Sequence, residues 1–248
     1  MTLSEFFSQH PKAALGFSGG VDSAYLLYAA VQCGADVRPY YIKTAFQPQF
    51  ELDDARRLCA QLGVPQTVLE LDALADAAVA ANPPDRCYFC KRNLFGALCA
   101  RASADGYTLL IDGTNASDDA GDRPGMRALR EMSVRSPLRE CGLTKPEIRW
   151  LSREAGLFTW DKPAYACLAT RIPAGEPITE EKLRATEEAE ALLASLGLRD
   201  FRVRRVGDAA KIQVRAGQLA LVLENRERIL SELGKHYADV WLDLEARA

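Results

Sequence analysis

The sequence contains little histidine, no excess of basic charge and no long hydrophobic run. Its 248 residues include 2 histidines, 31 lysines and arginines, and 34 aspartates and glutamates, which gives a formal net charge of −3. With only two histidines, the chain has few residues from which a histidine-rich metal site or a Ser/His/Asp triad could be built. A protein whose main task is to cover nucleic-acid phosphates needs a basic surface, and the composition does not supply one. We therefore expect no nucleic-acid partner.

The sequence also gives little indication of a membrane-spanning segment or of disulfide bonds. No apolar run approaches the roughly 20 residues that span a bilayer, and the first residues, MTLSEFFSQH, do not place a basic start before an apolar stretch. The 7 cysteines are an odd number, which is not the pattern of a disulfide framework. We expect a cytoplasmic protein with reduced thiols and no membrane partner.

Apolar segments of strand length alternate with helical patterns through the first two thirds of the chain. The expected strands are 13–17, 37–43, 66–71 and 107–111, and the expected helices are 22–33, 52–62, 91–104 and 145–155. Strands separated by helices of this length predict right-handed crossovers, and hence a doubly wound, mostly parallel sheet with helices on both faces. The fold class predicted is α/β.

A smaller α+β domain is expected at the carboxyl end. A helix capped by Thr179 is followed by a hairpin over 201–206 and 211–214, a helix over 218–233 and a strand over 240–244. The proline-marked stretch before this helix is the expected linker. The predicted division is a first domain at 1–160, a linker at 161–178 that carries Cys167, and a C-terminal domain at 179–248.

The sequence SGGVDS, residues 18–23, lies between the first expected strand and the first expected helix. Its glycines let the backbone approach a ligand, and the helix start supplies N–H groups and the positive end of a dipole, a combination that suits pyrophosphate. The candidate ligands are Ser18, Gly19, Gly20, Asp22 and Ser23. The loop lacks the lysine of GxxxxGK[ST] and the spacing of GxGxxG. The alternative is an ordinary glycine-rich turn that caps a helix.

Two cysteines, Cys87 and Cys90, form a CxxC within NPPDRCYFCK, which we place in a proline-rich loop before a helix. Thiols at this spacing can bind one metal ion, and the basic neighbours favour thiolates. A redox pair or two partly buried cysteines are the alternatives. A third candidate, Cys167, lies in PAYACLATR, where Arg171 could stabilise a thiolate. A buried structural thiol is the other interpretation of Cys167.

Arg202 and Arg204 fall on one face of the expected strand 201–206, because side chains alternate along a strand. Two guanidinium groups on one surface can form bidentate contacts with a phosphate or a carboxylate. A solvated, charged strand is the alternative.

These motifs together give the chain a family resemblance. SGGVDS resembles the signature of the PP-loop ATP pyrophosphatases, which adenylate a substrate and release pyrophosphate. Nearly the whole chain is similar to the LarE family, the ATP-dependent sulfur transferases that make pyridinium-3,5-bisthiocarboxylic acid mononucleotide for the nickel-pincer nucleotide cofactor. The motifs that carry the resemblance are SGGVDS (18–23), NPPDRCYFCK (82–91), DGTN (112–115), RPG (123–125), SPL (136–138), WDKPAYACLATRIP (160–173) and FRVRRVG (201–207).

The resemblance implies a mechanism. ATP with Mg²⁺ adenylates a carboxylate of pyridinium-3,5-biscarboxylic acid mononucleotide, and sulfur then displaces AMP. In members with one reactive cysteine, the position matching Cys167 gives up its own sulfur. This chain resembles the three-cysteine subgroup, in which Cys87, Cys90 and Cys167 are expected to hold a [4Fe-4S] cluster that carries an extra sulfide. The pattern favours the cluster; a zinc site is the alternative, but zinc offers no obvious sulfur delivery.

The resemblance also suggests how the substrate is held. The expected substrate-binding residues are Arg202, Arg204, Glu190, Thr170 and Arg171, with the first two on the phosphate. Three positions depart from the family pattern: Thr170 stands where serine is commoner, and Lys211 and Gln213 stand where arginine and glutamate are expected. Family members form homo-oligomers, so we expect one here.

Other functions fit the sequence less well. A PP-loop tRNA thiolase shares the loop and paired cysteines but needs a basic RNA-binding surface. An amide-forming synthetase needs an ammonia source, and no glutaminase region is present. A non-enzymatic protein that binds adenine nucleotides would leave the three cysteines Cys87, Cys90 and Cys167 unexplained.

Overall fold

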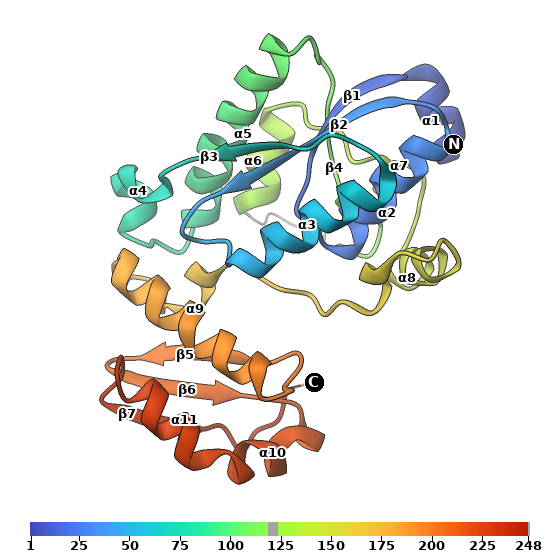
Figure 1. Ribbon diagram of the computed structural model, residues 1–248. Helices are drawn as coiled ribbons and strands as arrows, with labels where there is room; N and C mark the ends of the chain where they lie inside the picture. The colour runs from blue at the N-terminus through green and yellow to red at the C-terminus, as the bar shows by residue number, and fades with distance from the viewer. Residues whose placement is uncertain (119–123, 248) are drawn as a thin grey trace. The chain divides into compact units, whose positions relative to one another are not determined.

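The computed structural model describes residues 1–118 and 124–247, so Arg123 of the RPG motif lies outside the described residues. The chain forms two compact units, which can be followed by colour in Figure 1. The first contains the described residues of Met1–Ala73 and Asp85–Lys162, and the second those of Leu74–Pro84 and Pro163–Ala248. Two separate stretches of the chain therefore form the second unit, and no pattern in the sequence indicates the first of them, Leu74–Pro84.

A four-stranded sheet organises the first unit. Its strands are β1 (Lys12–Gly16), β2 (Asp36–Lys43), β3 (Thr67–Glu70) and β4 (Leu110–Asp112). They are ordered β3-β2-β1-β4, and every neighbouring pair is parallel. This arrangement confirms the predicted α/β fold with a parallel central sheet. The chain builds outward from β1 to β2 and β3 and then places β4 on the other side of β1, so the direction of winding reverses at β1.

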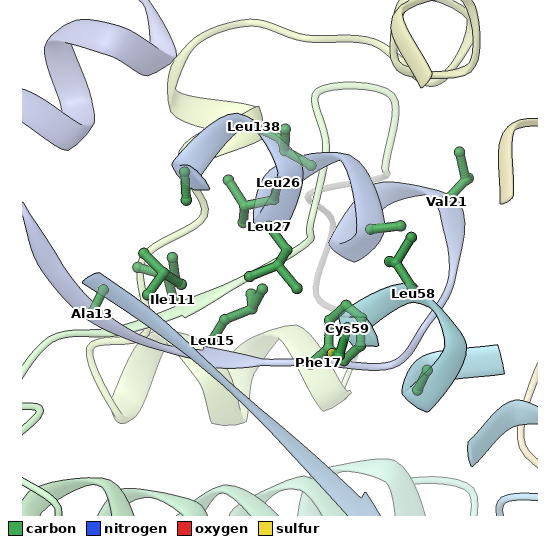
Figure 2. Close-up of a cluster of buried hydrophobic side chains, with 14 of the residues drawn as sticks. Ala13, Leu15, Phe17, Val21, Leu26, Leu27, Leu58, Cys59, Ile111 and Leu138 are labelled. Atoms are coloured by element: carbon green, nitrogen blue, oxygen red, sulfur yellow. The ribbon is translucent and has the colours of Figure 1, made fainter. Parts of the chain in front are cut away.

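Helices cover both faces of this sheet. Ala13 and Leu15 of β1 pack with α2 (Val21–Gln32) and α3 (Gln49–Leu62) in one buried cluster, which Figure 2 shows in part. Ala14 packs in a second cluster with Leu98 of α5 (Arg86–Ala104). Successive residues of β1 thus point to opposite faces and meet different helices. Burying a leucine in such a cluster contributes about 1.5–3 kcal/mol, so the two clusters hold the three layers together.

The other helices of the first unit are short. They are α1 (Leu3–Gln9), α6 (Pro124–Glu131), α7 (Pro137–Glu140), α8 (Lys145–Glu154) and the 3₁₀ turn η2 (Phe158–Asp161). The helical pattern over 145–155 predicts α8, whereas α1, α6 and α7 have no counterpart among the expected helices. Among the described residues, no helix is both long enough and apolar enough to cross a membrane.

Helix α5 begins at Arg86, five residues before the predicted start at Lys91. Cys87 and Cys90 therefore lie inside the first turns of the helix, and their predicted placement in a loop is wrong. Pro83 and Pro84 keep helix α5 from extending further toward the N-terminus. None of the five residues after Asp85 disfavours a helix strongly, so the helix begins there.

The second unit is built on a three-stranded sheet. Its strands are β5 (Arg202–Val206), β6 (Ala209–Gln213) and β7 (Asp239–Leu242), and its helices are η1 (Ala73–Ala75, at the boundary), α4 (Ala77–Ala80), η3 (Leu168–Arg171), α9 (Glu180–Ser195), η4 (Ala216–Gln218), α10 (Leu219–Glu224) and α11 (Arg226–Leu233). Strands β5 and β6 are antiparallel, and β6 and β7 are parallel. Val203 and Ile212 pack with Leu193 of α9 and Ile229 of α11, so this unit has its own core.

One predicted helix is broken. The expected helix over 218–233 ends at Glu224, and a new helix starts at Arg226. Asn225 between them has φ −100° and ψ 12°, and its side-chain amide donates to the carbonyl of Leu221 at 2.9 Å. A short polar side chain that bonds to a backbone carbonyl four residues earlier competes with helix continuation, which explains the break.

Asn82 ties the segment 74–84 to the second unit. Its side-chain amide donates to the carbonyl oxygens of Pro173 at 2.8 Å and Glu176 at 3.0 Å. Its own carbonyl accepts from the backbone N–H of Gly175 at 2.7 Å. Asn82 has φ +55°, a conformation that asparagine tolerates better than most residues. The segment joins the second unit through these bonds to residues about 90 positions later.

Candidate functional site

The SGGVDS loop follows β1 and leads into α2, at the carboxyl edge of the parallel sheet. The hydroxyl oxygens of Ser18 and Ser23 lie 3.1 Å apart, and the Ser23 hydroxyl donates to the carbonyl of Gly20 at 3.2 Å. Gly19 has φ +71°, and a β-carbon there would lie 3.1 Å from that of Ala55. The first bond within α2 runs from Ala24 N to Gly20 O, so the three N–H groups before it have no helical partner. Such donors suit an anion.

The loop after β4 packs against this helix start. Gly113 of the DGTN motif faces Ser23, and a β-carbon on Gly113 would lie 2.8 Å from the backbone nitrogen of Ser23. Asp112 is buried and accepts hydrogen bonds from the hydroxyls of Thr114 and Ser136, each at 2.7 Å. The loops after β1 and β4 therefore meet at the topological switch point, where open parallel sheets bind ligands.

The carboxylate of Asp22 is held from two distant segments. Asn115 donates its amide to Asp22 Oδ1 at 3.3 Å, and Lys145 Nζ lies 2.5 Å from Asp22 Oδ2. Asn115 is buried, whereas the side chains of Asp22 and Lys145 are 21% and 30% exposed. Lys145 was not among the predicted site residues. Its place at the start of α8, after Thr144, resembles an ordinary helix start, so no local signal could have found it.

Replacing Gly113 by alanine should destabilise this site. The new β-carbon would lie within 3.0 Å of the Ser23 backbone, and a contact that close forces the loop to shift. We expect the free energy of unfolding to fall by about 1–3 kcal/mol, measured by urea denaturation. Gly96→Ala is the matched control, because that position in α5 has open space and alanine favours helix by about 1 kcal/mol. Equal stability of Gly113→Ala and wild type would contradict the close packing.

Cys87 and Cys90 lie three residues apart at the start of α5 and so share one face of the helix. Cys87 is exposed and Cys90 is half-buried. This spacing fits two ligands of one metal centre. Cys167 belongs to the second unit. Within residues 1–118 and 124–247, no three histidine, cysteine, aspartate or glutamate side chains lie close enough together to hold a metal ion.

In the second unit, a buried ion pair holds the segment that carries Cys167. Arg171 donates to both carboxylate oxygens of Glu190, at 2.7 Å from Nε and 3.2 Å from Nη2. Arg171 Nη1 also donates to the hydroxyl of Thr170 at 2.7 Å, and that hydroxyl donates to the carbonyl of Cys167 at 2.8 Å. A chain of hydrogen bonds thus runs from helix α9 to the backbone of Cys167.

Glu190 accepts two further hydrogen bonds. The hydroxyl of Tyr165 donates to it at 2.5 Å and the backbone N–H of Val203 at 2.9 Å. Burial and the neighbouring Glu190 carboxylate raise the pKa of Tyr165, so its hydroxyl stays protonated and remains a donor. Glu190 is therefore buried with both oxygens engaged by protein groups, whereas the family resemblance implies that it contacts the substrate.

The two arginines of β5 differ in availability. Arg202 is buried, stacks 5.4 Å from the centre of the Tyr165 ring, and donates to the carbonyls of Phe201 and Ala164 at 2.6 and 2.5 Å. Arg204 is exposed; its Nε donates to Gln213 at 2.7 Å and its Nη1 to the carbonyl of Thr170 at 3.1 Å.

Other arginines lie near both Arg202 and Arg204, together with the carboxylate of Glu190. Burial, followed by the charges of Arg171 and Arg247, lowers the pKa of Arg202 and of Arg204. An anion close to these guanidinium groups would be attracted by the same charges. Arg204 is the better placed of the two to bind one, because it is exposed.

Replacing Glu190 by glutamine should destabilise the second unit strongly. Arg171 would keep its buried charge without a carboxylate, and loss of one partner from a buried ion pair costs about 3–5 kcal/mol. Glu188→Gln on the same helix is the control, because Glu188 is 51% exposed and pairs with His236 at the surface, where about 0–1 kcal/mol is expected. Urea denaturation of both variants measures the difference. Equal stability of the two would contradict the structural role of Glu190.

The chain is similar in sequence to several known proteins. A family model described as "Queuosine biosynthesis protein QueC" matches residues 12–83, which include the SGGVDS loop. The chain is 37% identical over 251 residues to an uncharacterised protein of Synechocystis sp., covering 98% of this chain and 92% of that protein. It is 32% identical over 248 residues to the Lactiplantibacillus plantarum protein named pyridinium-3,5-bisthiocarboxylic acid mononucleotide synthase, covering 98% and 89% respectively. A tRNA-specific 2-thiouridylase MnmA of Rhizobium johnstonii is 28% identical over 60% of this chain and 47% of its own length.

Proposed function

Because the chain belongs to the LarE family, the family of pyridinium-3,5-bisthiocarboxylic acid mononucleotide synthase, we propose that it inserts sulfur into pyridinium-3,5-biscarboxylic acid mononucleotide at the expense of ATP. Its relatives in the PP-loop superfamily are ATP-using sulfur transferases. The observation that carries the proposal is the SGGVDS loop at the switch point of a parallel sheet, with Asp22 held by Asn115 and Lys145.

Adenylation is the first proposed step. A substrate carboxylate oxygen attacks the α-phosphorus of ATP, the bond to the β-phosphate breaks, and pyrophosphate leaves, so that an acyl adenylate forms. The serine hydroxyls, the glycine backbone and the first N–H groups of α2 bind the pyrophosphate. Lys145 supplies the cation that the loop itself lacks. Asp22 is the carboxylate that would hold Mg²⁺, which when bound neutralises phosphate charge.

Sulfur transfer is the second proposed step. The thiolate of Cys167 attacks the acyl carbon, the bond to the AMP oxygen breaks, and a thioester forms. Removal of the Cα proton of Cys167 then breaks its Cβ–S bond, which releases the thiocarboxylate and leaves dehydroalanine in the chain. The hydrogen bonds from Thr170, Arg171 and Glu190 fix the backbone around this thiol.

The family resemblance offers a second sulfur source. Cys87, Cys90 and Cys167 would hold a [4Fe-4S] cluster, which when bound supplies an additional sulfide at its open iron. The spacing of Cys87 and Cys90 on one turn of α5 fits two of these ligands. Cys167 is required by both sources. Arg204 is the proposed ligand of the substrate phosphate. Arg202, which is buried on the same strand, is the neighbouring arginine.

The test uses anaerobically purified protein, Mg-ATP and the biscarboxylate nucleotide. We expect pyrophosphate release that depends on this nucleotide, together with thiocarboxylate product identified by mass spectrometry. A parallel reaction contains bulk tRNA in place of the nucleotide, because MnmA proteins match part of this chain. Pyrophosphate release that responds to tRNA and not to the nucleotide would overturn the proposal in favour of tRNA thiolation.

A further inference from the structure

Residues 156–162, here called the strap, run along helix α3 in the direction opposite to it. The side chain of Gln61, near the end of α3, donates to the carbonyl of Gly156 at 3.2 Å. One turn earlier in α3, the guanidinium of Arg57 lies 4.1 Å from the centre of the Phe158 ring. The strap therefore leads the chain from the end of α3 back toward its beginning, and Figure 1 allows its course below α3 to be followed.

Lys162 ends the strap in a nearly buried cluster of charges. Its Nζ lies 2.7 Å from Oδ2 of Asp54 and 3.3 Å from Oε1 of Glu51, both in the first turns of α3. The side chains of Lys162 and Glu51 are only 13% and 11% exposed. The ring of Phe50 lies beside the ammonium group, 5.6 Å away. Two carboxylates and one ring thus surround this lysine.

The backbone of the same residue is fixed from the other side. Arg149 of α8 donates from Nη1 to the carbonyl of Trp160 at 2.6 Å, and from Nη2 to the carbonyl of Lys162 at 2.8 Å. Helices α3 and α8 therefore hold both the side chain and the main chain of Lys162. Lys162 is the last residue of the first unit. Pro163 begins the longer of the two stretches that form the second unit.

The beginning of α3 is also part of the nucleotide site. Ala55 directly follows Asp54, and its β-carbon lies 3.1 Å from where a β-carbon on Gly19 would stand. Helix α3 follows β2 and so starts at the carboxyl edge of the sheet, the edge at which the SGGVDS loop leaves β1. The strap thus fixes Lys162 to the helix turn that supports the proposed ATP loop.

Stability alone is a weak reason for this cluster. Charged groups lose hydration when buried, so a buried ion pair is often no more stabilising than apolar residues of the same size. Burial raises the pKa of Glu51, and the charge of Asp54 raises it further, whereas Lys162 lowers it. Lys162 supplies the positive charge that offsets these two neighbouring carboxylates. These ion pairs hold the chain at Lys162 against the first turns of α3.

We propose that Lys162 is a positioning residue for sulfur transfer, because it fixes the point from which the chain leaves the first unit toward Cys167. Cys167 follows five residues later, and five extended residues span at most about 18 Å. A fixed starting point therefore limits where the thiol can be carried. This inference rests on the proposed function, since it assigns Lys162 to the coupling between its two steps.

The test measures the coupling ratio, the pyrophosphate released per thiocarboxylate formed, in a single turnover. Lys162→Met keeps the length of the side chain and removes its charge. We expect nucleotide-dependent pyrophosphate release to stay within about twofold of wild type and thiocarboxylate formation to slow by about 10- to 100-fold, because misplacement of a reacting group has effects of that size. Lys162→Arg should restore the ratio. A triple variant, Lys162→Met with Glu51→Gln and Asp54→Asn, leaves no buried carboxylate unpaired and should show the same loss of coupling.

The control is Arg56→Met, which removes an ion pair with Asp53 on the surface of the same helix, where the arginine is 56% exposed. It should leave the coupling ratio unchanged. If both reaction steps fall in proportion in the single and the triple variant, Lys162 is merely structural and the inference is overturned. An unchanged coupling ratio overturns it as well. If wild-type protein itself releases no pyrophosphate with the nucleotide, the proposed function fails, and that outcome is distinguishable from failure at Lys162.

Discussion

Cys167→Ala should abolish thiocarboxylate formation, by at least about 1000-fold, and leave nucleotide-dependent pyrophosphate release intact. The thiol is the proposed nucleophile in one sulfur source and a cluster ligand in the other, so both sources require it. The loop proposed to bind ATP belongs to the first unit and does not contain this residue. Liquid chromatography with mass spectrometry measures the product, and a coupled assay measures the pyrophosphate.

The matched control is Cys99→Ala, which removes an exposed thiol from α5 that has no proposed role. It should retain both activities. Product formation by Cys167→Ala at the wild-type rate would contradict the assignment of the thiol. The intact mass of wild-type chain after turnover separates the two sulfur sources. Loss of one H₂S per product identifies Cys167 as a consumed donor, whereas an unchanged mass supports a cluster held with Cys87 and Cys90.

Asp22→Ala should lose both steps, with pyrophosphate release and thiocarboxylate formation each reduced by at least about 100-fold. The substitution removes the carboxylate that would hold Mg²⁺ and leaves Lys145, which lies 2.5 Å from it, without its partner. An acyl adenylate that never forms cannot accept sulfur, so the second step must fail with the first. The same two assays measure both effects.

Asp53→Ala is the control for Asp22, because its side chain is 60% exposed on α3 and pairs only with surface groups in the described structure. It should behave as wild type. Asp22→Ala should also keep the thermal midpoint of wild type within a few degrees, since the side chains of Asp22 and Lys145 are only partly buried and water can still reach the lysine left without its partner. Full pyrophosphate release by a folded Asp22→Ala variant would remove the SGGVDS loop from the proposed mechanism.

Local sequence patterns predicted three of the four strands of the central sheet closely, whereas β4 begins at Leu110, three residues after the predicted start at Tyr107. Apolar strands separated by helical patterns gave β1, β2 and β3 within a residue or two, because alternation and helical spacing are properties of neighbouring residues. The errors came where a local preference was weak. Helix α5 starts earlier than expected, and Asn225 breaks a predicted helix through a side-chain bond to the backbone carbonyl of Leu221. The resemblance to the LarE family rested on short motifs and is confirmed by the comparison over 98% of the chain.

The sequence by itself determined the fold class, the family and the loop proposed to bind ATP, because each is encoded in residues that are neighbours along the chain. Only the tertiary structure showed that Asp22 pairs with Lys145, 123 residues later. It also showed that Glu190 binds Arg171 in the hydrogen-bond chain that ends at the carbonyl of Cys167. The anchoring of Lys162 against α3 was likewise decided by the fold. The physical reason is that ion pairs and hydrogen bonds act over a few ångströms, so their partners are known only once the path of the chain is known.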